Sequence, residues 1–300
     1  MPTHEAAVKE RTDTGDVSGD NVKLKKKTEI RTGSEVSFSL GFDSQRLREL
    51  AERFIADSVR EDADTSFLSE LRNRKSNRVA EQTQRRVAML NNFALLPGNM
   101  QFEPGPTLIF GDNGSGKTIL ADAISMAVQK ALFMQERGDD ADPSDPANIF
   151  RPRIPGYSGQ GLNGNDPRMD AHVEFVYSIA ECIDVHQLTL PEGAQSVEIT
   201  SALRTAAALG NVAMGVSTRQ AIGELEGARG GRSLVDIYDE PELGLSPRKQ
   251  NTELDAMVEA RAAGIVGLVP TNSGILFTGN RPRIDLDVPE LGVHVPNTDS

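Results

Sequence analysis

Residues 111–118 carry the clearest chemical pattern in the chain, because glycines, a lysine and a hydroxyl stand at fixed spacing in the run GDNGSGKT. The apolar residues 107–110 predict a buried strand before it, and 119–131 predict a helix after it, the setting of a phosphate-binding loop. Glycines let backbone amides curl around a phosphate chain, and the helix N-terminus adds positive potential there. The candidate nucleotide ligands are Asn113, Gly114, Ser115, Gly116, Lys117 and Thr118.

Two residues of this loop have separate expected tasks. Lys117 is placed to reach the β- and γ-phosphates of a nucleoside triphosphate, and the Thr118 hydroxyl to hold Mg²⁺. The sequence therefore predicts binding of ATP together with Mg²⁺.

A second cluster lies at residues 234–241, where an apolar strand ends in two acids, Asp239 and Glu240. In a nucleotide-binding fold the first acid can bind Mg²⁺ through water, and the second can orient or deprotonate the attacking water. Asp236 stands in the middle of the same strand, where a buried carboxylate must be paired. The sequence does not identify its partner.

The segments that position these residues divide the chain into three parts. We expect a flexible tail at 1–35, a helical segment at 36–86 and a nucleotide-binding domain at 87–300. The helical segment is expected to hold helices at 43–60 and 65–82. Within the domain we expect a strand at 86–90, a turn at 97–99, a long loop at 138–166, antiparallel strands at 172–177 and 182–190, and a helix at 198–209.

The second expected helix is basic at its end, in contrast with the chain as a whole. Its basic residues are Arg72, Arg74, Lys75 and Arg78, and Arg85 and Arg86 follow. This surface is the best candidate for binding nucleic acid or an acidic partner, and the alternative is a solvated helix face.

Composition narrows the class of protein. The formal net charge of −12 argues against a surface that coats nucleic acid indiscriminately, although it leaves room for a local basic groove. The single cysteine, Cys182, rules out an internal disulfide framework, fits a reducing cytosol and is expected to be a packed hydrophobic residue. Without a membrane-length apolar run or a signal peptide, we expect a cytoplasmic protein with no direct membrane contact.

Over residues 86–287 the chain resembles the ABC-type ATPases, and particularly their soluble SMC/RecF-like branch. The resemblance rests on Asn-Gly-Ser-Gly-Lys in the phosphate loop, on the run DEPELGLSP at 239–247, and on VSTRQ at 216–220, which precedes Asp239 by the interval of the family's signature segment. It implies an α/β fold: a P-loop NTPase of ABC-ATPase type, with a mixed sheet core containing antiparallel strands. The segment at 36–86 is then an N-terminal helical addition.

The resemblance also implies roles for residues in this chain. In that family ATP is held between two heads, so Ser217 would contact the γ-phosphate of a second copy; the alternative for Ser217 is a plain helix N-cap. Thr218 and Arg219 replace the family's two usual glycines. Asn272 stands where the family usually has a phosphate-sensing histidine, and it can hydrogen-bond but not titrate, so slow hydrolysis is expected.

A magnesium-contacting glutamine is also implied. Gln187 is the first choice for it, and Gln160 is the alternative.

The leading functional hypothesis is a soluble ATPase whose nucleotide-dependent head-to-head dimerisation controls a partner. The partner would be a nuclease or another effector in DNA maintenance or phage defence. No heptad pattern runs between Lys117 and Ser217, so we expect an ATPase head without the long coiled-coil arms of SMC proteins. The alternatives are a nucleotide-binding subunit of a membrane transporter, which the ELGLSP run and the degenerate signature disfavour, and a P-loop small-molecule kinase, which the acidic strand and the signature spacing disfavour.

Overall fold

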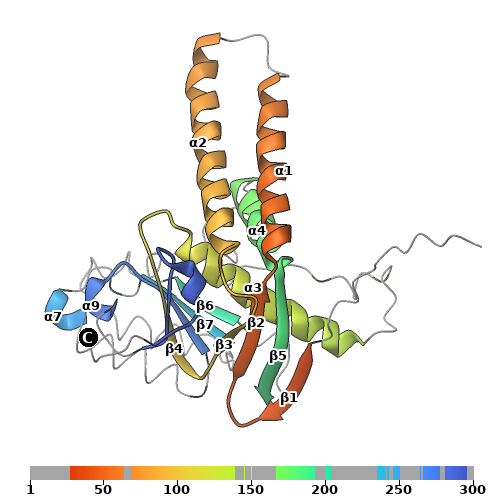
Figure 1. The fold of residues 1–300 in the computed structure, drawn as a ribbon, viewed down its shortest axis with the longest axis vertical. Coiled ribbons are helices and arrows are strands. Elements are labelled where there is room, and N and C mark those ends of the chain that lie inside the picture. The colour runs from red at the N-terminus through yellow and green to blue at the C-terminus, as the bar shows by residue number, and fades with distance from the viewer. Residues whose placement is uncertain are drawn as a thin grey trace, which may run out of the picture.

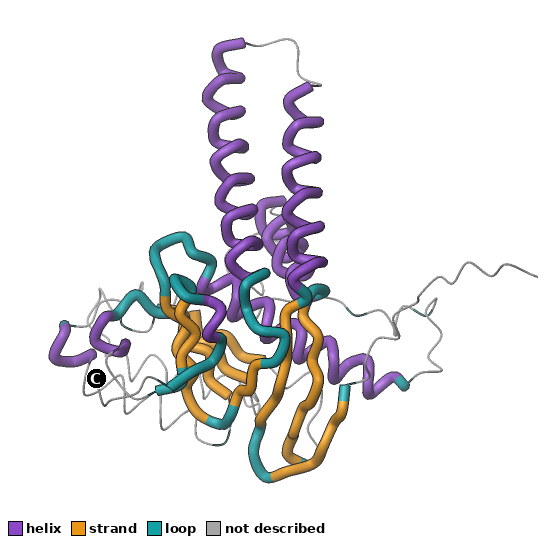
Figure 2. Tube along the Cα trace, in the orientation of Figure 1, coloured by secondary structure: helices purple, strands orange, loops and turns teal. Residues whose placement is uncertain are grey.

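The structure is a computed structural model, and it describes residues 28–63, 69–138, 145, 150, 167–192, 200–204, 235–240, 242, 246–250, 264, 266–277 and 281–295. Two β-sheets lie side by side, and a pair of long helices projects from them (Figure 2). The fold is therefore mixed α/β, with parallel and antiparallel strands.

The first sheet carries the nucleotide-binding motifs. Its strand order is β6-β7-β8-β4-β9, and every neighbouring pair is parallel. Strands β7 and β8 are buried almost throughout, as expected for parallel strands covered on both faces. The carboxyl ends of parallel strands meet at one edge, which is where ligands bind in open α/β sheets. The strands are β4 (Gly105–Phe110), β6 (Thr200–Arg204), β7 (Val235–Asp239), β8 (Val266–Pro270) and β9 (Arg283–Asp285).

The second sheet has the order β1-β5-β2-β3 and is mixed. β1 runs parallel to β5, whereas β2 is antiparallel to both β5 and β3. The rings of Phe38 and Phe102 stack across β2 and β3 with their centroids 4.8 Å apart. The strands are β1 (Glu29–Gly33), β2 (Ser37–Phe42), β3 (Met100–Phe102) and β5 (Ile183–Pro191).

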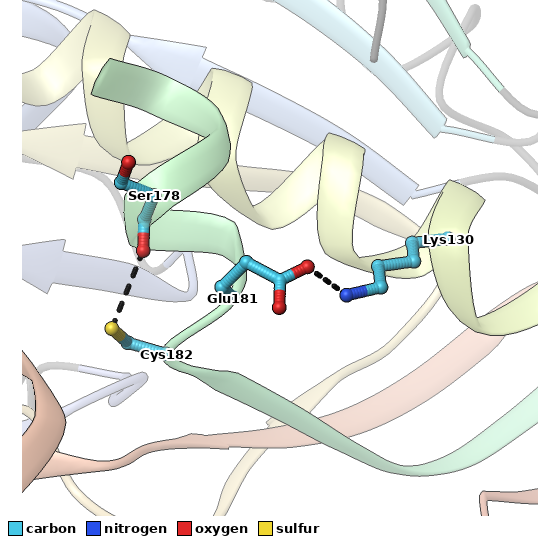
Figure 3. A network of polar contacts seen from close by, with 4 residues as sticks. All are labelled: Lys130, Ser178, Glu181 and Cys182. Atoms are coloured by element: carbon cyan, nitrogen blue, oxygen red, sulfur yellow. Dashed lines mark hydrogen bonds and ion pairs between the residues drawn. The ribbon is translucent and has the colours of Figure 1, made fainter. Parts of the chain in front are cut away.

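Helix α3 (Lys117–Arg137) joins the two sheets, since it contacts β5 of one and β4, β7 and β8 of the other (Figure 1). Helix α4 (Pro167–Ala180) packs on α3. Lys130 of α3 forms an ion pair with Glu181 in the turn that follows α4, and the Cys182 thiol donates to the Ser178 carbonyl at 3.3 Å (Figure 3). Cys182 is buried, as expected, and burial raises the pKa of its thiol.

Helices α1 (Ser44–Ala63) and α2 (Ser69–Phe93) form an antiparallel hairpin that stands away from the sheets (Figure 1). Asp43 caps α1, because its carboxylate accepts the backbone N–H groups of Gln45 and Arg46, each at 3.1 Å. At the base of the hairpin, the Arg86 guanidinium lies 5.6 Å from the ring centre of Phe54 and 4.8 Å from that of Phe175. This contact fastens both helices of the hairpin to α4.

Short elements complete the fold: α7 (Pro247–Lys249), α9 (Gly274–Phe277) and the 3₁₀ turn η5 (Pro289–Leu291). Within the described part of the chain, no helix combines the length and the apolar character needed to cross a membrane.

Three expected elements are wrong. Residues 86–90 are the last turns of α2 rather than a strand, because Leu90 and Phe93 are spaced to bury one helical face. Residues 172–177 belong to helix α4, and residues 200–204 form strand β6 within the range expected to be helical. The strand expected at 182–190 is confirmed as β5, and it pairs antiparallel with β2.

The expected division of the chain into three parts stays a prediction, although its ranges cut across the observed elements. Strand β1 falls inside the expected tail at 1–35, and β2 falls inside the expected helical segment at 36–86. Both strands belong to the second sheet. Helix α2 continues across the boundary at residue 86.

Candidate functional site

The phosphate loop connects β4 to α3 at the carboxyl edge of the parallel sheet. Gly116 caps α3 with a left-handed φ of 96°, which a residue with a side chain rarely adopts. A Cβ on Gly116 would lie 2.8 Å from Met89 Sδ and 2.9 Å from Phe93 Cζ. The end of α2 therefore packs directly on the phosphate loop.

The Lys117 side chain is held over this loop by backbone carbonyls of the loop. The residue is only 6% exposed, and its ammonium donates to the carbonyls of Gly111 at 2.8 Å and Asp112 at 3.0 Å. Burial lowers the pKa of Lys117, and the negative charges of Glu240, Glu242, Asp112 and Asp239 oppose that shift. The nearby acids and carbonyls thus offset part of the cost of burying the Lys117 charge.

Thr118 and Asp239 meet across the site although they are 121 residues apart in the chain. The Thr118 hydroxyl donates to Asp239 Oδ1 at 2.8 Å. A hydroxyl and a carboxylate side by side are oxygen ligands of the kind that Mg²⁺ takes, usually with one or two carboxylates and the phosphates of the substrate.

Glu240 and Asn272 form the second polar pair. The Asn272 amide donates to Glu240 Oε1 at 2.6 Å, and the Glu240 backbone N–H donates to the Pro270 carbonyl at 2.8 Å. Glu240 has a φ of 46°, the sole positive value at a non-glycine residue among those described. Such left-handed backbone costs free energy and concentrates at functional sites. The end of β7 is therefore turned so that this carboxylate faces the end of β8.

The segment after β8 is also fixed to the phosphate-loop strand. The Thr271 backbone N–H donates to the Ile109 carbonyl at 3.0 Å, so Asn272 stands next to the end of β4. The structure thus brings Lys117, Thr118, Asp239, Glu240 and Asn272 to one edge, although the sequence spreads them over more than 150 positions.

Asp236 has the partner that the sequence did not identify. The Tyr238 hydroxyl donates to Asp236 Oδ2 at 2.9 Å, and both side chains are buried. The two residues stand two positions apart, on one face of β7, and this alternation is the signal that could have predicted the pair.

Glu242 is a residue whose part the sequence analysis missed. It lies in the run DEPELGLSP, where it has no expected role, and its Oε1 accepts the backbone N–H of Asn272 at 2.7 Å. No pattern in the sequence indicates this contact, because it depends on how the segment after β7 approaches the one after β8.

Of the other expected ligands, the structure describes only Gln187. Ser217, Thr218, Arg219 and Gln160 lie outside the described residues. Gln187 lies in the middle of β5 in the second sheet, where its amide oxygen, turned toward Arg31, accepts from the guanidinium nitrogens at 2.7–3.3 Å. The assignment of Gln187 as a magnesium contact stays a prediction that would require it to leave Arg31.

The residues present fit a triphosphate with Mg²⁺. Ser115 Oγ is buried and has no hydrogen-bond partner among the described residues, so it is free to bind a phosphate oxygen. A Cβ on Gly114 would meet no atom within 4 Å, which leaves open space over the loop. Asp112, Asn113 and Gly114 are exposed at its crest.

A phosphate loop between a parallel strand and a helix, with acids at the end of a nearby strand, fits a P-loop NTPase. In agreement with this class, the family model of the AAA domain matches residues 86–151, a stretch that includes the end of α2, the phosphate loop and α3. The match indicates a P-loop ATPase-like domain. A search of curated proteins found no match.

Proposed function

We propose that the protein is an ATPase that binds ATP with Mg²⁺ at the carboxyl edge of the parallel sheet. The observation that carries the proposal is the hydrogen bond between Thr118 and Asp239, because it joins the end of the phosphate loop to the acidic strand. A hydroxyl and a carboxylate side by side can hold Mg²⁺, directly or through its bound water, next to a triphosphate.

Each residue of the edge has a role in this proposal. On ATP binding, the Lys117 ammonium exchanges the carbonyls of Gly111 and Asp112 for phosphate oxygens. Ser115 Oγ and the loop amides bind the phosphate chain. Mg²⁺, when bound, neutralises phosphate charge as a Lewis acid.

Glu240 orients the attacking water and accepts its proton. The Asn272 amide holds the Glu240 carboxylate in place by its hydrogen bond. Because Asn272 cannot take a proton, all proton acceptance in this arrangement falls to Glu240.

Binding and hydrolysis are tested separately. Lys117→Ala removes the charged partner of the phosphates, and we expect calorimetry to detect no ATP binding. Lys130→Ala is the matched control, because this lysine of the same helix pairs with Glu181 instead. Glu240→Gln should bind ATP and hydrolyse it about 10²- to 10⁴-fold more slowly, the range of general base catalysis. Unchanged ATP affinity in Lys117→Ala, or wild-type turnover in Glu240→Gln, contradicts the assignment.

We further propose that the nucleotide state controls a partner through the hairpin. The contact of Met89 and Phe93 with Gly116 supports this, since a change in the phosphate loop bears directly on α2. The partner would be a protein effector or a nucleic acid in DNA maintenance or phage defence, as the resemblance to SMC/RecF-like heads suggests. Charge reversal at Arg72, Arg74, Lys75 and Arg78 should then weaken DNA or partner binding that is salt-dependent in the parent protein.

A further inference from the structure

Glu242 is a buried carboxylate beside the proposed catalytic pair. Its residue is only 9% exposed, and Oε1 accepts the backbone N–H of Asn272 at 2.7 Å. The side chain of the same Asn272 donates to Glu240 at 2.6 Å. One asparagine is therefore held through its backbone by Glu242 while its amide holds Glu240.

A second set of contacts connects the same two segments. Gln250 donates from its amide nitrogen to the Glu242 carbonyl at 3.5 Å and accepts the Ser273 hydroxyl at 3.0 Å. The Ser273 backbone N–H in turn donates to the Thr271 hydroxyl at 3.0 Å. The segment after β8 is thus tied to the segment after β7 beyond Asn272 through Ser273 and Gln250, and before Asn272 through the bond from the Glu240 N–H to the Pro270 carbonyl.

The charge of Glu242 is costly in this position. A buried carboxylate is tolerated only when it is hydrogen-bonded or faces a cation, and Glu242 Oε2 has no hydrogen-bond partner within the described part of the chain. The negative charge of Glu242 raises the pKa of Lys117 against the effect of burial. A residue that served packing alone would be apolar here, without the cost of burying a polar group.

We propose that Glu242 is a positioning residue for ATP hydrolysis, which holds the Asn272 backbone so that the Asn272 amide orients the Glu240 carboxylate. The inference rests on the proposed ATPase function and adds a residue to it. Because Glu242 acts through Asn272, its loss affects turnover, while the residues proposed to bind ATP (Lys117, Thr118 and Asp239) keep their places.

The test is a double-mutant cycle between Glu242 and Asn272, measured as single-turnover ATP hydrolysis and as ATP affinity. Glu242→Ala should slow hydrolysis between about tenfold and a hundredfold, the effect of misplacing a reacting group, and leave ATP affinity within about twofold. Glu242→Gln keeps an oxygen that accepts the Asn272 N–H, so it should restore most of the rate. In an Asn272→Ala background, Glu242→Ala should cause no further loss, because the amide that it positions is already gone.

A measurement independent of activity covers the case in which Glu242→Ala perturbs folding. Hydrogen exchange at the Asn272 backbone amide should be slow in the parent and in Glu242→Gln, and fast in Glu242→Ala.

Three results would overturn the inference. They are rate losses that add in the double variant, ATP hydrolysis as slow in Glu242→Gln as in Glu242→Ala, and unchanged hydrogen exchange at the Asn272 amide in Glu242→Ala. A parent protein that binds ATP without hydrolysing it overturns the proposed ATPase function itself, and the inference with it.

Discussion

At the scale of single residues, Lys117 shows two opposed electrostatic effects in one side chain. Burial disfavours its charged form and lowers its pKa, whereas four acids around the phosphate loop favour that form. Burial has the larger effect. The free protein therefore carries an electrostatic cost at Lys117, which phosphate oxygens would remove on binding.

This cost predicts a pH dependence of stability. The pKa of Lys117 is lowered in the folded state from its ordinary value of 10.5, so between the two values the unfolded chain binds more protons at this residue. The contribution of Lys117 to the free energy of unfolding therefore rises with pH across this window. Urea unfolding of the parent and of Lys117→Met at several alkaline pH values isolates the effect, since other groups cancel in the difference. A difference that is flat, or that falls with pH, contradicts the assigned direction.

The residues of the site could be predicted from sequence to different degrees. Lys117, Thr118, Asp239 and Glu240 stand in contiguous runs whose local setting indicates their chemistry, and the structure places them at one edge. The positioning contact of Glu242 with Asn272 joins residues 30 positions apart. It could not be predicted, because no local pattern encodes the approach of two loops.

At the scale of elements, the junction between α2 and the phosphate loop is the most consequential packing contact. Leu90 and Phe93 are fully buried, and Met89 and Phe93 leave no room for a side chain on Gly116. The hairpin is thus part of the core that supports the nucleotide site.

Two glycines of the loop provide a matched test of this junction. Gly114 and Gly116 both have a positive φ, and only Gly116 is in contact with α2. Gly114→Ala should cost about 1–2 kcal/mol, the usual penalty for left-handed backbone. Gly116→Ala should cost a further 1–3 kcal/mol or so, because the new methyl group collides with the Phe93 ring. Chemical unfolding measures both values. Equal losses would show that the contact with α2 carries no stability.

A second element-scale prediction concerns the base of the hairpin. Arg86 lies against the rings of Phe54 and Phe175, which also contact each other edge to face, and burial lowers the pKa of Arg86. Arg86→Ala should therefore lower the free energy of unfolding by about 1–2 kcal/mol, through lost cation–π attraction and lost packing. Arg85→Ala is the control: Arg85 is exposed on the same turn, and its loss should stay within about 0.5 kcal/mol. Similar losses in both variants would exclude a specific role for the Arg86 contact.

The wrong element predictions share a physical cause: a short apolar run fits both the periodicity of a helix and the alternation of a strand. Residues 172–177 alternate like a strand, yet Phe175, Val176, Ile179 and Ala180 are buried at helical spacing in α4. Pro167 at the first position of α4, following Asp166, was an available helix-start signal. Strand β6 has no such signal, since its place follows from pairing with β7.

At the scale of the whole molecule, α3 unites the fold, because it begins at the phosphate loop and then contacts both sheets. The hairpin leaves the same region, and its longer helix α2 has 25 residues, a length of about 37 Å at 1.5 Å per residue. A small tilt at the phosphate loop would therefore produce a larger displacement at the far end of the hairpin.

The last prediction concerns assembly. The crest of the phosphate loop and the Asn272 side chain are exposed, so the described residues would cover a bound triphosphate on one side and leave the other open. The resemblance to ABC-type heads suggests that Ser217 of a second copy covers the open side. ATP would then hold two copies together, and hydrolysis would release them, because the phosphate contacts are those that differ between the two states.

Sedimentation of Glu240→Gln with and without ATP tests this assembly, since the variant should keep ATP in place. We expect a monomer without nucleotide and a dimer with ATP. Ser217→Arg in the same background is expected to prevent the dimer while leaving ATP affinity unchanged, because the added side chain obstructs the surface facing the second copy and not the phosphate loop. The replacement of two family glycines by Thr218 and Arg219 predicts a weaker dimer, whose dissociation should be visible on dilution. An oligomeric state that is the same with and without ATP would contradict the shared site and leave each copy to bind its nucleotide alone.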